Sequence, residues 1–198
     1  ATPLPLTSDT LCCLACAQNP PPYACTVALW EYAPPIDKFI MQLKFQHRLV
    51  YANLMGRLLL EPIKACYQGA SFPELIVPVP LHPQRVRERG FNQALEIAKP
   101  IAQALSIPIN YTQCQRIRYT EPQAQRKRKN REQNIKNVFD TDLPPHSHIA
   151  LIDDVVTTGN TVQALTERLK QQGITRIDLW TVARTNLKHQ ARRGLSNN

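Results

Sequence analysis

The stretch Ile149–Thr161 reads Ile-Ala-Leu-Ile-Asp-Asp-Val-Val-Thr-Thr-Gly-Asn-Thr, and it decides the fold of the chain. Its first four residues are apolar, and such a run is typical of a strand that is buried on both faces. Two adjacent acids follow, then a hydroxyl-rich turn with one glycine, and a helical pattern begins at about Thr161. This order predicts an anion site, because free backbone N–H groups and the positive end of a helix converge at the turn.

The side chains of this turn indicate what the anion carries. Gly159 lets the backbone adopt a positive φ or approach a ligand closely. The adjacent carboxylates of Asp153 and Asp154 repel a phosphate, but they suit the vicinal hydroxyls of a ribose or a metal ion carried with it. An ordinary strand-turn-helix unit would explain the apolar run and the glycine, but not paired acids followed by three threonines. The stretch therefore predicts a ribose 5-phosphate site, with hydroxyl donors at Thr157, Thr158 and Thr161.

Length and composition favour a globular protein. The 198 residues suffice for one domain with a sizeable core and a small appendage. No apolar run approaches the roughly 20 residues of a membrane span. The N-terminus shows no basic region followed by an apolar core, which a signal peptide would need. We therefore expect a cytoplasmic protein with no membrane insertion.

The charge is strongly basic and unevenly distributed. The net charge is +9, and the segment from Gln115 to Lys136 holds eight Lys or Arg against two Glu. Basic proteins favour phosphate-bearing partners, either small phosphates or nucleic acid. A solvated basic face is the simpler interpretation, and we favour it for the basic tail that follows Arg184.

The six cysteines fall into two groups. Nothing suggests secretion, so a disulfide framework is not expected, and we predict that Cys66 and Cys114 are small buried apolar residues. Cys13 and Cys16 have the two-residue spacing of a zinc knuckle. A second pair at this spacing is missing, so bound Zn²⁺ and plain reduced thiols both remain open. Cys12 and Cys25 could contribute ligands.

Strand and helix patterns alternate along most of the chain. We predict strands over residues 27–33, 74–80, 107–111, 114–119, 149–152 and 177–182, and helices over 36–45, 49–67, 91–105 and 161–172. The second helix would have Leu54, Leu58 and Leu59 on its apolar side. Alternation of this kind predicts an α/β fold with an open parallel sheet flanked by helices. An irregular, cysteine-containing arm over residues 1–26 would precede this domain of residues 27–198.

An arginine-rich stretch follows the predicted strand over 74–80. It reads Leu-His-Pro-Gln-Arg-Val-Arg-Glu-Arg-Gly-Phe-Asn, and it places Arg85, Arg87 and Arg89 in a turn. Ligands of open α/β sheets bind beyond the carboxyl ends of the strands. Guanidinium groups bind phosphate oxygens in bidentate fashion, so the turn suits a pyrophosphate. A basic surface loop is the alternative.

Several blocks together resemble a known family. Ile149–Thr161 is similar to the phosphoribosyl pyrophosphate (PRPP) motif of the type I phosphoribosyltransferases. The other blocks are Val-Pro-Val-Pro, Arg-Glu-Arg-Gly-Phe-Asn-Gln, Arg-x-Arg-Tyr-Thr-x-x-Gln and Arg-x-x-Asn. As a set they resemble the ComF (GntX-like) family, which has the phosphoribosyltransferase fold and is linked to competence and the handling of incoming DNA. The resemblance extends from about Val27 to Arg184.

The resemblance implies a set of site residues. The PRPP-binding residues would be Asp153, Asp154, Val155, Val156, Thr157, Thr158, Gly159, Asn160 and Thr161. The pyrophosphate loop would contain Pro80, Arg85, Arg87 and Arg89. A flexible loop that closes over the site would contain Arg116, Arg118, Thr120, Gln123, Arg131 and Asn134. The catalytic residues would be Asp153, Asp154, Arg118 and Arg131.

The resemblance also implies ligands and partners. A transferase of this fold would bind PRPP with Mg²⁺ and pass the phosphoribose to a nitrogen acceptor that the sequence does not identify. The alternative is a non-catalytic protein that keeps the fold and binds single-stranded DNA or proteins of the DNA-uptake machinery. A homodimer also remains open. The family's zinc module has two Cys-x-x-Cys pairs, of which only Cys13 and Cys16 are present, so residues 1–26 resemble a remnant of it.

Overall fold

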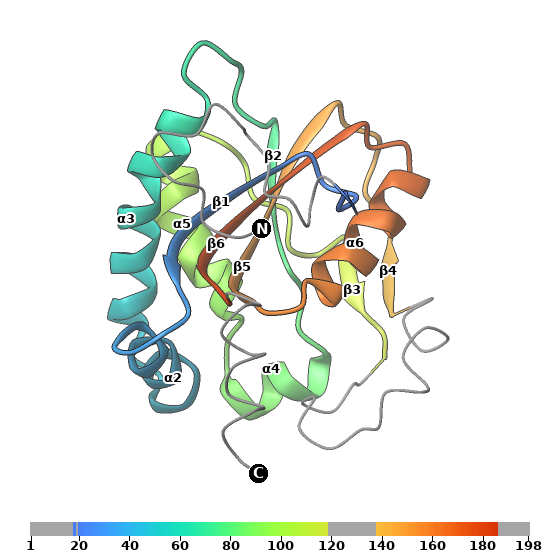
Figure 1. Cartoon of the computed structure of the whole chain (residues 1–198). Coiled ribbons are helices and arrows are strands. Elements are labelled where there is room, and N and C mark those ends of the chain that lie inside the picture. Colours follow the sequence, from blue (N-terminus) through green and yellow to red (C-terminus); the bar gives the residue numbers. More distant parts are fainter. Residues whose placement is uncertain (1–17, 19, 119–137, 186–198) are drawn as a thin grey trace.

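A parallel four-stranded sheet forms the centre of the protein (Figure 1). The computed structural model describes residue 18 and residues 20–118 and 138–185. The strand order is β1-β6-β5-β2, and every neighbouring pair in it is parallel. The strands are β1 (Cys25–Glu31), β2 (Leu75–Pro78), β5 (His148–Val156) and β6 (Arg176–Arg184). The predicted open parallel sheet is confirmed.

Strand β5 lies inside the sheet because both of its faces are apolar. Ile149 and Leu151 pack into one hydrophobic core, and Ala150 and Ile152 pack into another on the opposite face. Side chains alternate between the two faces of a strand, so consecutive residues of β5 belong to different cores. The apolar run Ile149–Ile152 therefore contributes to the hydrophobic cores on both faces of the sheet.

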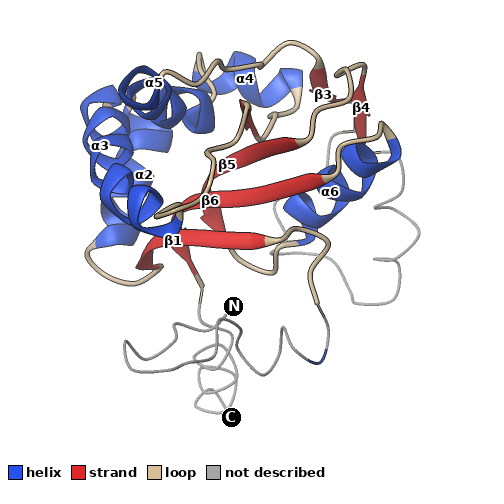
Figure 2. Ribbon diagram, turned by 90° about the horizontal axis from the view of Figure 1, so that it is seen from above, coloured by secondary structure: helices blue, strands red, loops and turns tan. Residues whose placement is uncertain are grey.

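Helices cover both faces of the sheet (Figure 2). One face carries α2 (Ile36–Gln46), α3 (Leu49–Cys66) and α5 (Gln93–Leu105). The other carries α6 (Asn160–Gln171) and a small antiparallel sheet of β3 (Cys114–Arg116) and β4 (Phe139–Thr141). A short helix, α4 (Pro83–Arg89), lies near the ends of the strands.

Helices α3 and α5 approach each other closely at Gly56. A Cβ atom there would overlap the carbonyl oxygen of Ile97 and the ring of Pro100, so only glycine fits. Gly56 lies on the buried side of α3, together with Ala52, Met55, Leu59 and Ile63. Leu59 is buried as predicted, whereas Leu54 and Leu58 are exposed, because they lie on the other side of the helix.

Two other predictions are wrong in detail. Residues 107–111 form no regular strand, and Ile109 makes only an isolated bridge to Ile76. Pro108 lacks an N–H group and cannot extend the hydrogen-bonded ladder. Cys66 is exposed at the last position of α3, whereas Cys114 is buried as expected. Within the described residues, no helix is both long and apolar enough to cross a membrane.

Candidate functional site

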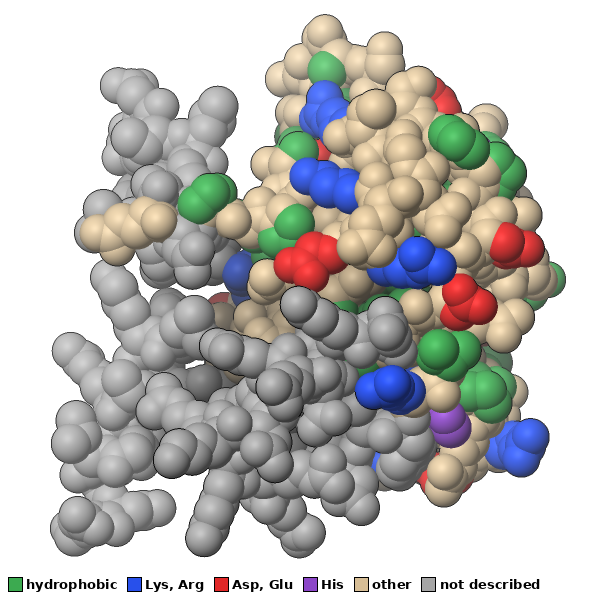
Figure 3. All heavy atoms as spheres, turned by 90° about the vertical axis from the view of Figure 1, so that its right-hand side faces the viewer, with side chains coloured by type: hydrophobic (Ala, Val, Ile, Leu, Met, Phe, Trp, Pro, Cys, Tyr) green, Lys and Arg blue, Asp and Glu red, His purple; other side chains and the backbone are tan. Residues whose placement is uncertain are grey.

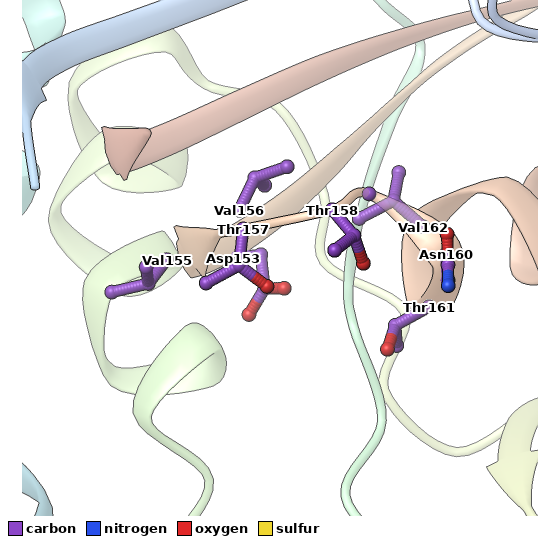
Figure 4. Close-up of a pocket in the computed structure, with 9 residues that line it drawn as sticks. Asp153, Val155, Val156, Thr157, Thr158, Asn160, Thr161 and Val162 are labelled. Carbon is purple, nitrogen blue, oxygen red and sulfur yellow. The ribbon is translucent and has the colours of Figure 1, made fainter. Parts of the chain in front are cut away.

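The candidate site lies where β5 ends and α6 begins, at the carboxyl edge of the parallel sheet. In open α/β sheets this edge is where ligands bind. A small pocket opens here (Figure 4). Its lining is Asp153, Val155, Val156, Thr157, Thr158, Gly159, Asn160, Thr161 and Val162.

The turn between β5 and α6 offers backbone donors. Gly159 is the N-cap of α6 with φ of +81°, in the left-handed region that favours glycine. No side chain caps this helix. Within the described residues, no backbone carbonyl accepts a hydrogen bond from the N–H groups of Thr157, Thr158 or Gly159. These donors and the positive end of the α6 dipole are therefore available to an anion.

The pocket also gathers side-chain oxygens. Thr157 and Thr158 are exposed, and Thr161 is partly buried in the first turn of α6. Figure 4 shows the Asp153 carboxylate and the hydroxyls of Thr158 and Thr161 on the same side of the turn. Hydroxyl donors beside free N–H groups suit a phosphate, and the nearby carboxylate suits hydroxyl groups.

The two acids of the motif have different surroundings. Asp153 lines the pocket and is partly exposed, whereas Asp154 is 6% exposed and does not line it. They are neighbours on β5, so their side chains leave opposite faces of the strand. Asp154 forms an ion pair with Lys44 of α2. Its N–H also donates to Oδ1 of Asp153, over 2.9 Å, which connects the two residues directly.

The electrostatics of the pair favour a proton on Asp153. Burial of the carboxyl group and the adjacent charge of Asp154 raise the pKa of Asp153 well above its ordinary value, and Lys44 opposes the rise. The protonated form of Asp153 is therefore favoured more than in a free carboxyl group. A cation, or ligand groups that donate hydrogen bonds, would favour the fully ionised pair.

The predicted arginine turn is a helix. Residues Pro83–Arg89 form α4, because His82 Nδ1 accepts a hydrogen bond from Gln84 N, Pro83 starts the helix and Gly90 ends it with φ of +73°. Four residues make about one helical turn, so Arg85 and Arg89 share one face of α4. Both are partly buried, whereas Arg87 is exposed. Pro80 is buried just before this helix.

Arg89 and Arg116 interact electrostatically with the acid pair. Burial lowers the pKa of the Arg89 guanidinium, and the charge of Asp154 partly offsets this. Burial likewise lowers the pKa of Arg116, and Asp153 partly offsets that. Arg116 also stacks over the ring of Phe139, 5.8 Å from its centroid. Arginines from α4 and β3 thus approach the acids from separate elements.

The remaining predicted residues are not part of this cluster. Arg118 is described and exposed. The predicted loop residues Thr120, Gln123, Arg131 and Asn134 lie outside the described residues. The predicted zinc ligands Cys13 and Cys16 also lie outside them.

Sequence reasoning missed two residues that support the site. Lys44 forms an ion pair with Asp154. The sequence shows Lys44 only as a cation at the end of an apolar helical pattern, and this does not indicate its partner. Asn92 caps α5 by accepting from Ala94 N at 3.0 Å, and its amide donates to the Val79 carbonyl at 3.1 Å. Asn92 thereby ties the start of α5 to the chain that leaves β2. An asparagine before a helical pattern is a recognisable cap signal.

The described residues contain no group of three or more His, Cys, Asp or Glu side chains that could hold a metal ion. Mg²⁺, however, seldom binds in an all-protein cage. It usually keeps several waters and takes one or two carboxylates plus the phosphates of its substrate. One pocket carboxylate beside anion donors fits an ion that arrives with a phosphorylated substrate, and does not fit a resident metal centre.

Comparison with known proteins defines the class. Residues 92–195, more than half of the chain, match the family described as "Phosphoribosyl transferase domain". The matched range includes the β5–α6 turn and the Asn92 cap. The chain belongs to the phosphoribosyltransferase-domain family.

Its relatives define the branch within this family. DNA utilization protein YhgH of Salmonella typhimurium is 35% identical over 185 residues, which cover 92% of this chain and 82% of the relative. Competence protein F of Haemophilus influenzae is 32% identical over 179 residues, covering 87% and 78%. The protein is thus a member of the ComF (GntX-like) group. Among solved structures, orotate phosphoribosyltransferase from Aeropyrum pernix is similar at 18% identity and a TM-score of 0.41, over 75% of this chain and 70% of that one.

Proposed function

We propose that the protein binds PRPP together with Mg²⁺ at the end of β5. The observation that carries this proposal is the β5–α6 turn, which offers backbone N–H groups and threonine hydroxyls directly beside a carboxylate. The anion donors match the 5-phosphate, and the carboxylate of Asp153 matches the ribose hydroxyls. Membership of the phosphoribosyltransferase-domain family supports the same ligand.

The proposed roles follow the positions of the side chains. Thr157–Thr161 hold the 5-phosphate, and Asp153 accepts hydrogen bonds from the ribose. Asp154, buried against Lys44, orients Asp153 and sets its charge. Arg89 of α4 and Arg116 of β3 meet the pyrophosphate, because they interact electrostatically with Asp154 and Asp153, and Arg85 joins them from the same face of α4 as Arg89. Mg²⁺ bound with PRPP would neutralise much of the pyrophosphate charge.

Calorimetry with PRPP and Mg²⁺ tests this proposal. The wild type should bind, and Asp153→Asn and Thr158→Val should each weaken binding by at least tenfold. Thr112→Val, an exposed threonine in the loop before β3, is the matched control and should bind like the wild type. Absence of binding by the wild type, or equal affinity in all four proteins, would refute the site.

We further propose that bound PRPP is used in transfer to a nitrogen acceptor. The nitrogen forms a bond to C1 of the ribose as the bond from C1 to the pyrophosphate oxygen breaks, and the nitrogen releases its proton to solvent. The protein's part is to position the reactants and to neutralise the leaving pyrophosphate. A panel of nitrogen acceptors with pyrophosphate release as the readout tests this. Tight PRPP binding without acceptor-dependent release would instead indicate PRPP as a regulator.

A second candidate function is binding of single-stranded DNA. The relatives are called DNA utilization and competence proteins, and Arg87 and Arg118 are exposed cations. On the described part of the face in Figure 3, however, Lys and Arg lie among Asp and Glu and form no continuous basic patch. Titration of labelled single-stranded DNA at rising salt separates the two candidates. Phosphate contacts require an affinity that falls steeply with salt.

A further inference from the structure

Two thiols meet at the opposite edge of the sheet from the candidate site. Cys25 is the first residue of β1, and Cys66 is the last residue of α3. Their sulfur atoms are 3.4 Å apart although the residues are separated by 41 positions. A disulfide has an S–S length of about 2.05 Å, so a small side-chain movement would bring the two sulfurs to bonding distance.

Both cysteines lie next to residues that are linked to the buried carboxylate of Asp178. Cys25 lies opposite Asp178 in the β1–β6 register. Cys66 precedes Tyr67, whose hydroxyl donates to Asp178 Oδ2 at 2.7 Å. The same carboxylate also contacts His148 Nε2 at 2.7 Å and Arg176 at 3.1 Å. Asp178 is fully buried, and its hydrogen bond with Tyr67 connects the end of α3 to β6, the strand that pairs with β1.

The two thiols differ in their access to solvent. Cys66 is exposed, whereas Cys25 is partly buried. Burial, and secondarily the hydrogen bond with Cys66, raises the pKa of Cys25 to about 12. Cys25 therefore stays protonated at neutral pH, and an oxidant in solution meets the Cys66 sulfur first.

We propose that Cys25 and Cys66 form a reversible redox site that closes to a disulfide on exchange with a low-molecular-weight disulfide. The Cys66 thiolate attacks one sulfur of the reagent, the reagent's S–S bond breaks, and one thiolate leaves. Cys25 then gives its proton to solvent and attacks the Cys66 sulfur, which releases the second thiolate. In balance, two protein thiols are oxidised to one disulfide, and one reagent disulfide is reduced to two thiols.

Closure would tie the start of β1 to the end of α3. The loop between the two cysteines contains all of α2, including Lys44, the partner of Asp154. A cross-link restricts the unfolded chain and thereby favours the native state. For a loop of this length and a chain of this size we expect a rise in Tm of about 5–10 °C.

The test uses the full-length chain in glutathione redox buffers of graded potential. Cys12, Cys13 and Cys16 are replaced by Ser to prevent exchange with the N-terminal thiols. Oxidation should remove two free thiols, give a non-reduced peptide that joins Cys25 to Cys66, and raise the Tm reversibly. Dithiothreitol should restore the starting Tm.

Single variants in the same background provide the controls. Cys66→Ser and Cys25→Ser should show no Tm rise on oxidation. Cys114→Ser should show the same Tm rise as the protein in which only Cys12, Cys13 and Cys16 are replaced. Circular dichroism checks that each variant is folded. Glutathione retained on Cys66 without the cross-link, or a cross-link without a change in Tm, would overturn the proposal.

Discussion

Lys44 of α2 forms an ion pair with Asp154 of β5, and both side chains are largely buried, at 21% and 8% exposure. The lysine comes from the helical layer on one face of the sheet, and its partner belongs to the motif at the sheet's edge. Because Lys44 also opposes the rise in the pKa of Asp153, this one cation influences both acids. The charge of the candidate site is thus set by a residue far from it in sequence.

Lys44→Met should destabilise the protein. Removing one partner of a buried pair leaves an uncompensated charge and costs about 3 kcal/mol. In a domain of this size the Tm should fall by roughly 6–12 °C. The deficit should be largest at pH 8 and shrink toward pH 5, because Asp153, whose pKa is raised well above its ordinary value, takes up a proton as the pH falls and the uncompensated negative charge decreases. Thermal unfolding followed by circular dichroism measures both effects.

Two companion variants show whether the charge of Lys44 is responsible. Lys38→Met removes an exposed lysine from the same helix and should leave the Tm nearly unchanged. Lys44→Arg keeps the cation and should recover part of the loss. A Tm deficit in Lys44→Met that is equal at pH 5 and pH 8 would contradict the electrostatic account.

Asp153→Asn should raise stability at neutral pH while weakening PRPP binding by at least tenfold. The folded-state pKa of Asp153 is raised, so its contribution becomes unfavourable as pH rises from the unfolded-state value of about 3.9 through the folded value. Asn keeps the Oδ1 acceptor for the Asp154 N–H but carries no charge. The Tm difference between variant and wild type should be positive at pH 8 and decrease as pH falls. A constant difference across this range would contradict the raised pKa.

Gly159→Ala should impair the site as well as the fold. Alanine at φ of +81° costs about 1–2 kcal/mol of backbone strain, which corresponds to a Tm drop of roughly 2–8 °C. Gly69→Ala is the matched control, because Gly69 has φ of +77° and lies after α3, and a Cβ atom would meet nothing within 4 Å at Gly69 and only ordinary van der Waals contacts at Gly159. Both variants should lose similar stability, but only Gly159→Ala should lose PRPP affinity. Equal PRPP affinity in the two variants would argue against the turn as the phosphate site.

Gly56→Ala should disrupt the packing of α3 on α5. The new Cβ atom would overlap a backbone carbonyl, and overpacking of this kind costs about 1–3 kcal/mol. This cost should exceed the roughly 1 kcal/mol that alanine adds to helix propensity. We expect a lower Tm, measured by calorimetry. Leu54→Ala, on the exposed side of α3, should change the Tm much less. A stabilised Gly56→Ala protein would show that the two helices can separate without cost.

The sheet and the β5–α6 turn could be predicted because their determinants are local. Residues Ile149–Ile152 form a doubly buried run, and acids, threonines and a glycine follow at fixed spacing, so the pattern contains both the strand and the anion donors. Boundaries at residues 107–111 were wrong because one proline ended the ladder. The buried side of α3 contains Ala52 and Gly56, and Leu54 and Leu58 made the other side look equally apolar in the sequence.

Features that depend on tertiary contacts could not be predicted. Arg85, Arg87 and Arg89 looked equivalent in sequence, but the capped helix α4 turns two of them inward and one outward. In the sequence Lys44 appears only as a polar residue near the end of an amphipathic helix. Its ion pair with Asp154 becomes visible only in the folded structure. Cys25 and Cys66 carry no spacing signal, because they meet across the sheet edge.

The alternation of β5 places the two motif acids in different layers of the protein. Asp153 emerges on the side of α6, and Asp154 emerges on the side of α2. Loosening either layer would move one acid relative to the other, although the residues are adjacent in the chain. The affinity for a ligand that contacts both acids therefore depends on the packing of both layers. We expect substitutions in the core, far from the site, to lower this affinity.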